Sequence, residues 1–472
     1  MLPSYEIRLV NVSLKNIKNV EEGNLDFVSP RGLSKASLLG LYGQNGSGKT
    51  SLIEALSLLK RVMSGAAVPA TFTDLISAGK EFAELAFQFE IQTEYRSMLV
   101  TYSFKVRSVK SVLSNSIEQG TADHMEIFDE VFKYSSKGSV VFKTREIINT
   151  TAENVPFSPK TKYDELLTLD KDVETELLVA KRVMTKLSKS FVFSEELFNA
   201  IQKQSRKYLG VQIHHVSFDV ITLLSCLKLY ASTQLFVIST KDMNLPSFGL
   251  MELHINHNNT TGMVAFHLDK PTLIRDIWVD TIEKVIEGMN VVLTQIVPGM
   301  TIGFVRLGSQ LMDDGSKGVN VQLTSHRNGR EIPLHCESEG IKKIISILQL
   351  LISVFNQSRI TVAIDELDAG IFEYLLGELL KIISEQGKGQ LIFTSHNLRP
   401  LETINKSFIA FTTTDPTNRY TRLTGVKTTN NLRDFYFRKI LLGGDQKNIY
   451  DSTSNAEIAF AMRDAFAGDQ NA

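Results

Sequence analysis

Hydrophobic and polar residues alternate near the start of the chain and then give way to an unbroken apolar run. The alternation at 5–12 and 25–28 predicts half-buried strands, and the apolar segment 37–42 predicts a strand buried on both faces. Helical spacing follows at 50–63, and alternating segments between 84 and 106 predict a hairpin. The opening of the chain therefore predicts a mixed α/β unit.

The middle of the chain has a different pattern. From about residue 106 to residue 271 it is rich in serine and lysine, and helical spacing with charged faces occurs at 163–188, 195–207 and 219–231. We therefore expect a compact, mostly helical insertion. Because this segment lacks heptads sustained over many turns, it is not expected to form a long coiled coil.

A second α/β pattern follows the insertion. It begins with a predicted helix at 272–293, and then helices at 341–355 and 371–385 alternate with apolar strands at 360–365 and 390–395, as in a parallel sheet. We expect an α/β head that is split in two by the insertion. The predicted parts are the N-terminal half of the head at 1–105, the insertion at 106–271, the C-terminal half at 272–412, and an extension at 413–472 with a weakly ordered or peripheral tail at 451–472.

The composition of the chain indicates the cellular compartment and the kinds of partner to expect. The 472 residues include 51 Lys plus Arg and 52 Asp plus Glu, so no global field attracts nucleic acid or an anionic membrane. Only Cys226 and Cys336 are present, which excludes a disulfide framework and a cysteine metal site. No signal sequence or window of about 20 apolar residues occurs, so a cytoplasmic protein without membrane contact is expected.

Residues 43–50, Gly-Gln-Asn-Gly-Ser-Gly-Lys-Thr, lie between a predicted strand and a predicted helix. This context fits the P-loop, whose backbone N–H groups surround the β-phosphate of a nucleotide. Lys49 is expected to reach the β- and γ-phosphates, and the Thr50 hydroxyl to ligate Mg²⁺. An ordinary glycine-rich turn would not need a lysine and a hydroxyl after its last glycine. The residues predicted to bind ATP here are Gly43, Asn45, Gly46, Ser47, Gly48, Lys49, Thr50 and Ser51.

The apolar strand at 360–365 ends in two neighbouring carboxylates. In a Walker B segment, Asp365 would hold Mg²⁺ and Glu366 would orient the attacking water. Taken alone, such a pair is more often a solvated turn, but the residues that follow favour catalysis. Asp368 fits the D-loop and is expected at the nucleotide, and His396 follows the next strand as a switch histidine would.

Upstream of this strand, Ser338 and Gly340 precede the helix predicted at 341–355. A serine, a glycine and a helix N-terminus fit a degenerate ABC signature, which binds the γ-phosphate of ATP held by another head. The simpler interpretation is a serine N-cap, because the segment lacks the full leucine-led consensus. The segment lies upstream of the Walker B strand, where the ABC motif order requires a signature, and this position favours the signature over a simple N-cap.

With these motifs in this order, residues 5–105 and 300–412 resemble the ABC-type ATPases related to the SMC and OLD families. The resemblance implies an ATPase that uses ATP and Mg²⁺ and works as a homo-oligomer, in which two heads close around ATP. The Q-loop glutamine is not assigned, with Gln88 and Gln92 as candidates. No acidic cluster after His396 resembles the nuclease domain of OLD proteins, so the chain is expected to lack nuclease activity of its own.

The segments 395–402 and 431–438 are similar to those of bacterial anti-phage defence ATPases, such as the AriA-type ATPase of the PARIS system or the Septu ATPase. This resemblance implies a switch that controls a separate nuclease-type effector encoded nearby and that responds to a phage trigger protein. A DNA repair or maintenance ATPase is the alternative. A small-ligand importer component is a third class, which the insertion and the C-terminal tail argue against.

Local basic stretches are the features of the sequence that would suit DNA contact. They include Lys105 with Arg107, Lys181 with Arg182, and Lys203 with residues up to Tyr208. In a chain of neutral charge, such stretches are usually solvated faces.

Overall fold

The computed structural model describes most of the 472 residues. The described residues are 5–27, 36–94, 96–112, 121–138, 141–167, 171–207, 215–239, 250–257, 260–422, 431–442, 449–450 and 453–469. No helix among them is long and apolar enough to cross a bilayer.

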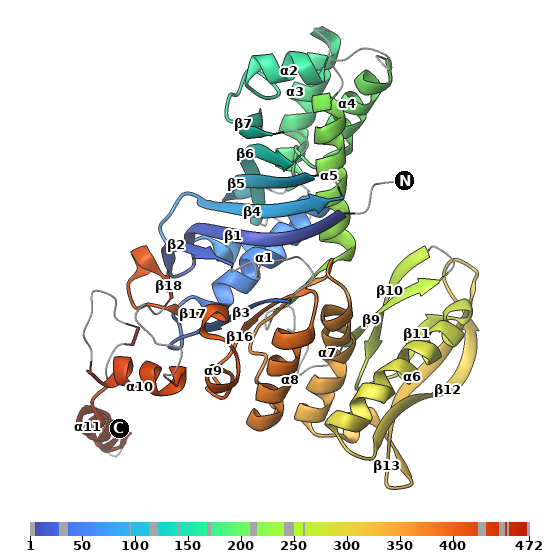
Figure 1. Ribbon diagram of the computed structural model, residues 1–472, viewed down its shortest axis with the longest axis vertical. Coiled ribbons are helices and arrows are strands. Elements are labelled where there is room, and N and C mark those ends of the chain that lie inside the picture. Colours follow the sequence, from blue (N-terminus) through green and yellow to red (C-terminus); the bar gives the residue numbers. More distant parts are fainter. Residues whose placement is uncertain are drawn as a thin grey trace.

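A six-stranded, mainly parallel sheet forms the centre of the head (Figure 1). The strand that leads to the P-loop segment lies in its middle, and only the edge strand β18 runs antiparallel to its neighbour. In sheet order the strands are β18 (Tyr420–Thr421), β17 (Ile409–Thr412), β3 (Ser37–Tyr42), β16 (Gln390–Thr394), β15 (Thr361–Ile364) and β8 (Leu235–Ile238).

Both faces of this sheet are covered, which explains why β3 has no polar face. Leu39 and Leu41 belong to the hydrophobic core that includes α1 (Lys49–Ser64), whereas Leu38 and Tyr42 belong to a second core on the opposite face. The second core is closed by α7 (Glu339–Asn356), α8 (Glu373–Gln386) and α9 (Pro400–Thr403). Burial on two faces favours the continuous apolar strands of a parallel sheet.

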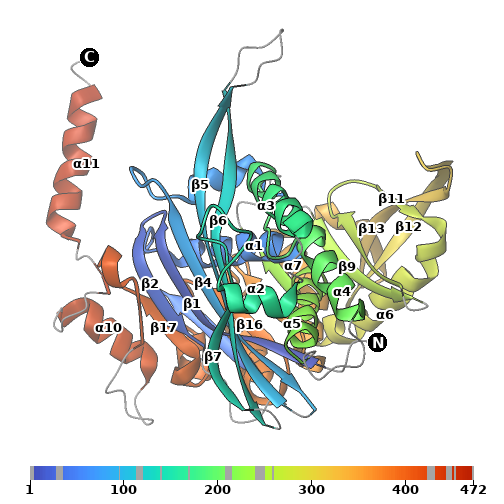
Figure 2. The same cartoon turned by 90° about the horizontal axis from the view of Figure 1, so that it is seen from above.

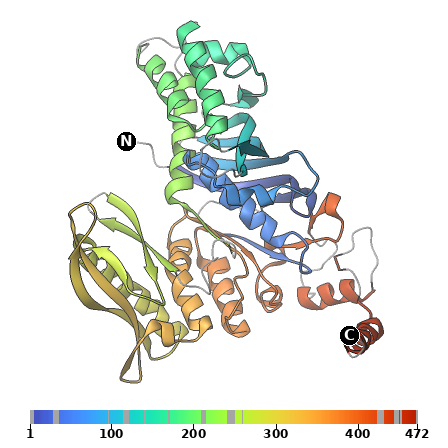
Figure 3. The same cartoon turned by 180° about the vertical axis from the view of Figure 1, so that it is seen from behind.

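A second, antiparallel sheet lies on the other side of α1 (Figure 1). Its strands follow the order β2 (Val20–Asp26), β1 (Tyr5–Ile17), β4 (Ala83–Thr93), β5 (Arg96–Val112), β6 (Thr121–Gly138) and β7 (Phe142–Asn149). Four helices pack at this end of the molecule (Figure 3): α2 (Lys160–Leu166), α3 (Lys171–Lys186), α4 (Glu195–Lys207) and α5 (His215–Thr233).

One buried side chain joins the two sheets. Gln390, at the start of β16, accepts a hydrogen bond from Leu9 N at 3.1 Å and donates one to Leu9 O at 2.8 Å. These bonds lie beside a bulge in the pairing of β1 with β4, where the register shifts between Leu9 and Asn11. The amide therefore satisfies backbone groups of β1 in the manner of a neighbouring strand.

A side lobe and a C-terminal extension complete the chain. The lobe contains β9 (Leu250–His257), β10 (Thr260–His267), β11 (Thr272–Arg275), α6 (Val279–Ile296), β12 (Met300–Leu311), β13 (Lys317–Arg327) and β14 (Arg330–Pro333). The extension contains α10 (Leu432–Leu442) and α11 (Asn455–Asp469). Tyr436 of α10 is buried and stacks on Phe411 of β17 with ring centroids 5.0 Å apart, so α10 belongs to the head core.

Several predicted elements differ from the structure. The segment 106–271 is not mostly helical, because it holds β6 to β10 as well as α2 to α5, and β8 completes the central sheet. Its predicted start lies inside β5, since residue 106 pairs with Ala83. Residues 272–275 form β11 and not a helix, because they pair with β13. The predicted helix at 163–188 is divided into α2 and α3, and residues 168–170 between them lie outside the described part.

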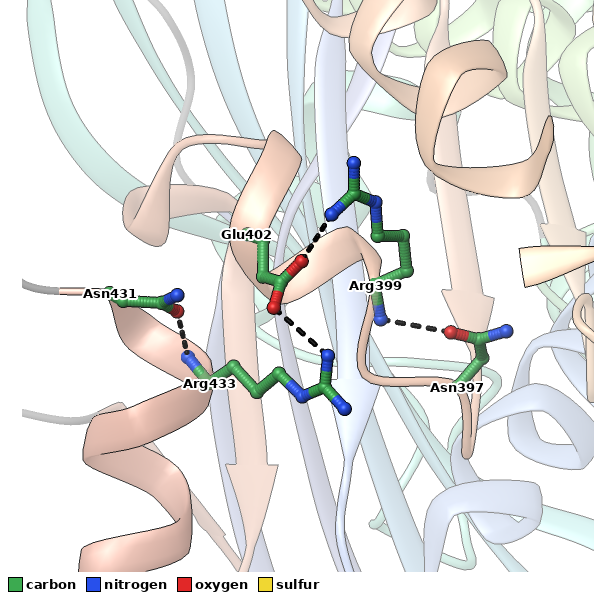
Figure 4. Close-up of polar contacts among 5 residues, drawn as sticks. All are labelled: Asn397, Arg399, Glu402, Asn431 and Arg433. Carbon is green, nitrogen blue, oxygen red and sulfur yellow. Dashed lines mark hydrogen bonds and ion pairs between the residues drawn. The ribbon is translucent and has the colours of Figure 1, made fainter. Parts of the chain in front are cut away.

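The segments 395–402 and 431–438, far apart in sequence, meet where α9 and α10 adjoin (Figure 4). Glu402 accepts hydrogen bonds from Arg399 and from Arg433, the latter at 3.0 Å. An asparagine side chain also holds the backbone of each arginine. Arg399 N donates to Asn397 Oδ1 and Arg433 N donates to Asn431 Oδ1, both at 2.9 Å. These ion pairs hold α10 beside the loop that carries the predicted switch histidine.

Candidate nucleotide-binding site

The loop at 43–48 turns tightly between β3 and α1, and its glycines are required by space and conformation. A Cβ atom at Gly43 would lie 1.8 Å from Thr412 Oγ1, so no side chain fits there. Gly48 has φ 92°, a left-handed conformation that glycine adopts at little cost. Its position at the N-cap of α1 leaves the first N–H groups of that helix without a side-chain cap, as an anion site requires.

Polar contacts hold the same loop in shape. Lys49 Nζ donates to the carbonyl oxygens of Gly43 and Gln44 at 2.8 and 2.9 Å. Ser47 Oγ donates to Gln44 O at 2.6 Å and also bonds the Thr412 hydroxyl. Burial lowers the pKa of Lys49, and the neighbouring carboxylates, led by Asp365, oppose that shift. The lysine therefore lies across the loop with negative charge close by.

The acidic pair at the end of β15 is organised by a threonine of the next strand. Thr394 Oγ1 donates to Asp365 Oδ1 at 2.6 Å and accepts from Glu366 N at 2.8 Å. Asp365 is fully buried, whereas Glu366 is partly exposed and has a left-handed backbone with φ 47°. The two carboxylates thus differ in exposure, Asp365 being buried and Glu366 partly open to solvent.

Asp368 binds the loop that carries His396. Its Oδ2 atom accepts from His396 N at 3.0 Å and from Asn397 N at 2.9 Å. The D-loop and the histidine loop are therefore one hydrogen-bonded unit, although 28 residues separate Asp368 from His396. His396 itself is exposed.

These segments meet around a cavity of 660 Å³. Most of the predicted residues line it: Asn45, Gly46, Ser47, Gly48, Lys49, Thr50, Ser51, Asp365, Glu366, Asp368 and His396. Lys18, Asn19, Ala369 and Thr394 also line it and were not predicted. Neither Gln88 nor Gln92, the Q-loop candidates, is in the lining, and Gln88 donates to Thr101 Oγ1 at 3.3 Å within the antiparallel sheet.

Two lysines outside the predicted set lie near the acidic residues. Lys18 lines the cavity from the turn between β1 and β2 and forms an ion pair with Glu54 of α1. Lys343 of α7 is fully buried, and burial lowers its pKa to about 8 against the opposing influence of carboxylates that include Asp365 and Glu366. The sequence offered one indication of Lys343, because this lysine occupies a position on the apolar face of a predicted helix.

Ser338 and Gly340 are not in the cavity lining of their own chain. Ser338 is the N-cap of α7, where its hydroxyl accepts from Ile341 N at 3.3 Å, as the simpler interpretation of this serine requires. Gly340 packs against the D-loop, because a Cβ atom added to it would lie 2.0 Å from Gly370 O. Ser338 is nevertheless exposed and accessible to another molecule.

The contact between the two backbones makes Gly340 sensitive to substitution. Gly340→Ala is expected to destabilise the fold by about 1–3 kcal/mol, because the methyl group must displace backbone and not a flexible side chain. Thermal unfolding should show a lower midpoint. Gly288→Ala is the control, since Gly288 lies in α6 with no atom within 4 Å of an added Cβ and should become slightly more stable. Equal midpoints for both variants would contradict the close contact.

The donor set fits Mg²⁺ bound together with a nucleotide. Among the described residues, no group of three or more His, Cys, Asp or Glu could hold a metal unaided. Thr50 and Asp365 line the same cavity and offer a hydroxyl and a buried carboxylate. Mg²⁺ commonly takes one or two protein oxygens and completes its shell with phosphate and water, so these two residues would hold it when ATP is bound.

The fold and this cavity define the chain as a P-loop ATPase of the α/β class, with the P-loop at the carboxyl end of a central parallel strand. The family described as AAA domain matches residues 11–210. The C subunit of the nuclease SbcCD from Bacillus subtilis (strain 168) is 27% identical over 166 residues, which is 34% of this chain. The match spans only 14% of that protein's length.

Solved structures that match this chain include an SMC head domain from Thermotoga maritima and the recombination mediator protein RecF with ATP. The first is 14% identical with a TM-score of 0.34, over 88% of this chain and 99% of that one. The second is 13% identical with a TM-score of 0.32, over 83% and 94% of the two chains.

Several basic residues considered for DNA contact have partners within the chain. Lys105 pairs with Asp129 at 3.0 Å, and Arg107 pairs with Glu126 at 2.7 Å, across β5 and β6. Lys181 donates to the carbonyl of Ala152 at 2.7 Å. Paired cations are poor ligands for a phosphate backbone. Tyr208, the aromatic residue of the third stretch, lies outside the described residues.

Proposed function

We propose that this chain is a switch ATPase in which two copies close around ATP, hydrolyse it slowly and thereby control a separate effector. The observation that carries the proposal is the single cavity that joins the P-loop, Asp365, Glu366 and His396. Within it, Lys49 would bind the phosphates, and Glu366 would orient or deprotonate water. Mg²⁺ on Thr50 and Asp365 would neutralise developing charge on the phosphates.

The need for two copies follows from the position of the signature candidate. Ser338 and Gly340 do not line their own cavity, whereas Ser338 and Glu339 at the start of α7 are exposed. A helix N-terminus carries partial positive charge, which suits a γ-phosphate presented by a second head. Each complete site would then combine the P-loop of one copy with the Ser338 segment of the other.

Mixing two inactive variants tests the composite site. Ser338→Arg is expected to bind ATP but not to hydrolyse it, and Lys49→Ala is expected to lose ATP binding. Together they should recover ATPase activity, because a heterodimer pairs the intact P-loop of the first with the intact signature segment of the second. If the mixture, with co-assembly verified, is no more active than either variant alone, the site is not shared between two copies and each chain contains a complete site.

For the biological role we propose bacterial anti-phage defence, with a nuclease-type effector encoded nearby and a phage protein as trigger. Support comes from the segments 395–402 and 431–438, whose contact through Glu402 joins the C-terminal extension to α9, the helix that follows the loop with His396. Such a contact suits a switch that passes the nucleotide state to a partner. The experiment is infection of cells that carry this chain and its neighbouring gene, with protection expected only when both are intact.

The second candidate is a DNA repair or maintenance ATPase, favoured by the match to a subunit of the nuclease SbcCD. A nuclease partner or DNA would then be the ligand of the head. Duplex DNA binding by the isolated chain that weakens steeply with salt would favour this candidate, since release of counterions accompanies phosphate contacts. The internal pairing of Lys105 and Arg107 argues against DNA contact through these two residues.

A further inference from the structure

Thr394 is the last residue of β16, the strand that runs beneath the antiparallel sheet when the molecule is seen from above (Figure 2). The residue is buried, with 1% of its surface exposed. Its hydroxyl donates to Asp365 Oδ1 at 2.6 Å and accepts from Glu366 N at 2.8 Å, and its carbonyl oxygen accepts from Leu367 N at 3.0 Å. One buried residue therefore holds three consecutive residues at the end of β15.

The chain leaves the central sheet at this point. Asp365 N still donates to Ile238 O of β8 at 2.9 Å, as a residue of the strand would. The next residue, Glu366, has φ 47°, a left-handed backbone that is costly for a residue with a Cβ atom. Such a conformation persists only where its surroundings impose it. The hydrogen bond from Glu366 N to Thr394 Oγ1 is a contact of this kind, because it holds the amide at the turn.

The chemistry of the bonded groups fixes the direction of both hydroxyl contacts. A backbone N–H can only donate and a carboxylate can only accept, so the hydroxyl hydrogen points to Asp365 and an oxygen lone pair faces Glu366 N. The buried Asp365 thereby orients the threonine, and the threonine holds the backbone of Glu366. The hydroxyl thus connects the residue expected to hold Mg²⁺ with the residue expected to orient water.

We propose that Thr394 is a positioning residue for ATP hydrolysis, which holds Glu366 in the backbone conformation that presents its carboxylate to the attacking water. This inference rests on the proposed role of Glu366 and adds a residue that acts through it. Rotation of the backbone at Glu366 would move the carboxylate, and a displacement of about 1 Å is enough to cost about a hundredfold in rate.

The histidine loop has an anchor of its own. Asp368 Oδ2 accepts from His396 N and from Asn397 N, and neither bond involves Thr394. Loss of the Thr394 hydroxyl should therefore leave His396 in place. Assays at saturating ATP and Mg²⁺ separate the effect on Glu366 from a change in Mg²⁺ affinity that follows loss of the bond to Asp365.

Thr394→Val tests the proposal, because it removes the hydroxyl and keeps the shape of the side chain. Its kcat should fall at least about tenfold. Calorimetric titration should give an ATP dissociation constant within about threefold of the parent, since the P-loop is unchanged. Thr394→Ser keeps the hydroxyl, and its kcat should stay within about threefold of the parent.

Thr361→Val is the matched control at the other end of β15. Thr361 is also fully buried, and its hydroxyl donates to Gln390 Oε1 at 3.3 Å, away from the cavity. Both valine variants should unfold at a lower temperature than the parent, because each loses a buried hydrogen bond. Only Thr394→Val should lose kcat, which a purely structural role of the hydroxyl would not produce.

A double-mutant cycle shows whether Thr394 acts through Glu366. In the Glu366→Gln background, Thr394→Val should lower single-turnover hydrolysis by less than about twofold, because the side chain that it positions is already inactive. Losses that multiply in full would overturn the proposal. An unchanged kcat of Thr394→Val, or an equal loss in Thr394→Ser, would overturn it as well. If Thr394→Val does not fold, Thr394→Cys, with a weakly bonding thiol, takes its place with the same outcomes.

Failure here is distinguishable from failure of the proposed function. If Glu366→Gln keeps the turnover of the parent, the proposed role of Glu366 is wrong and the role of Thr394 is excluded with it. If Glu366→Gln is slow and Thr394→Val is not, only the inference about Thr394 is overturned.

Discussion

Replacing Lys49 with alanine is expected to abolish measurable ATP binding. The ammonium group is buried at the mouth of the P-loop and is the cation that the motif supplies to the β- and γ-phosphates. Loss of charge-assisted hydrogen bonds to two phosphates should reduce affinity about a hundredfold or more. Calorimetric titration with ATP and Mg²⁺ measures the change directly.

Two features make this experiment specific. Lys18 also lines the cavity, but its ion pair with Glu54 commits its charge to the protein, so it should not compensate. Lys80→Ala, which removes an exposed lysine elsewhere, is the control and should bind ATP like the parent. Unchanged affinity of Lys49→Ala would remove the lysine from the phosphate site.

Glu366→Gln is expected to bind ATP and to hydrolyse it about a hundredfold more slowly or worse, which is the usual loss when a general base is missing. Glutamine has nearly the same shape, and the bond between Glu366 N and Thr394 Oγ1 involves the backbone, so the geometry at the end of β15 should persist. Closed dimers that retain ATP should accumulate. Single-turnover hydrolysis together with sedimentation in ATP measures both effects.

Glu385→Gln provides a control with the same chemical change on an exposed part of α8. Its turnover should equal that of the parent. If Glu366→Gln also kept the parent's turnover, Glu366 would not be the residue that activates water. The result is independent of the Lys49 experiment, because it concerns a step after ATP binding.

The α/β order of the head was predictable because its strands and helices have distinct hydrophobic periods. The helix α4 begins and ends where the pattern indicated, at 195 and 207. The strand at 235–238 could not be predicted, because four residues are too few to show a hydrophobic period. Only pairing with β15 makes them a strand of the central sheet. The strand at 272–275 was mistaken for a helix for the same reason, since β13 determines its conformation.

In the candidate site, too, some residues could be predicted from the sequence and others could not. Motifs with fixed spacing predicted a P-loop together with Asp365, Glu366 and His396, and these three residues line one cavity with residues 45–50. Thr394 and Asn19 were missed because their roles depend on contacts across the fold. Thr394 reaches the end of a neighbouring strand, and Asn19 donates to Gly46 O from the turn between β1 and β2. A hydroxyl at the end of the strand beside β15 was the one available signal for Thr394.

The position of β3 in the central sheet limits how far the head can fold during its synthesis on the ribosome. Both hydrogen-bonded neighbours of this strand, β16 and β17, come from the last part of the chain. During synthesis, β3 therefore has two open edges until β16 is made and one open edge until β17 is made, although the antiparallel sheet at the N-terminus can already form. Open apolar strand edges favour aggregation, and chaperones protect them. Nascent chains that stop before β16 should consequently be insoluble or chaperone-bound, however well their first sheet has folded.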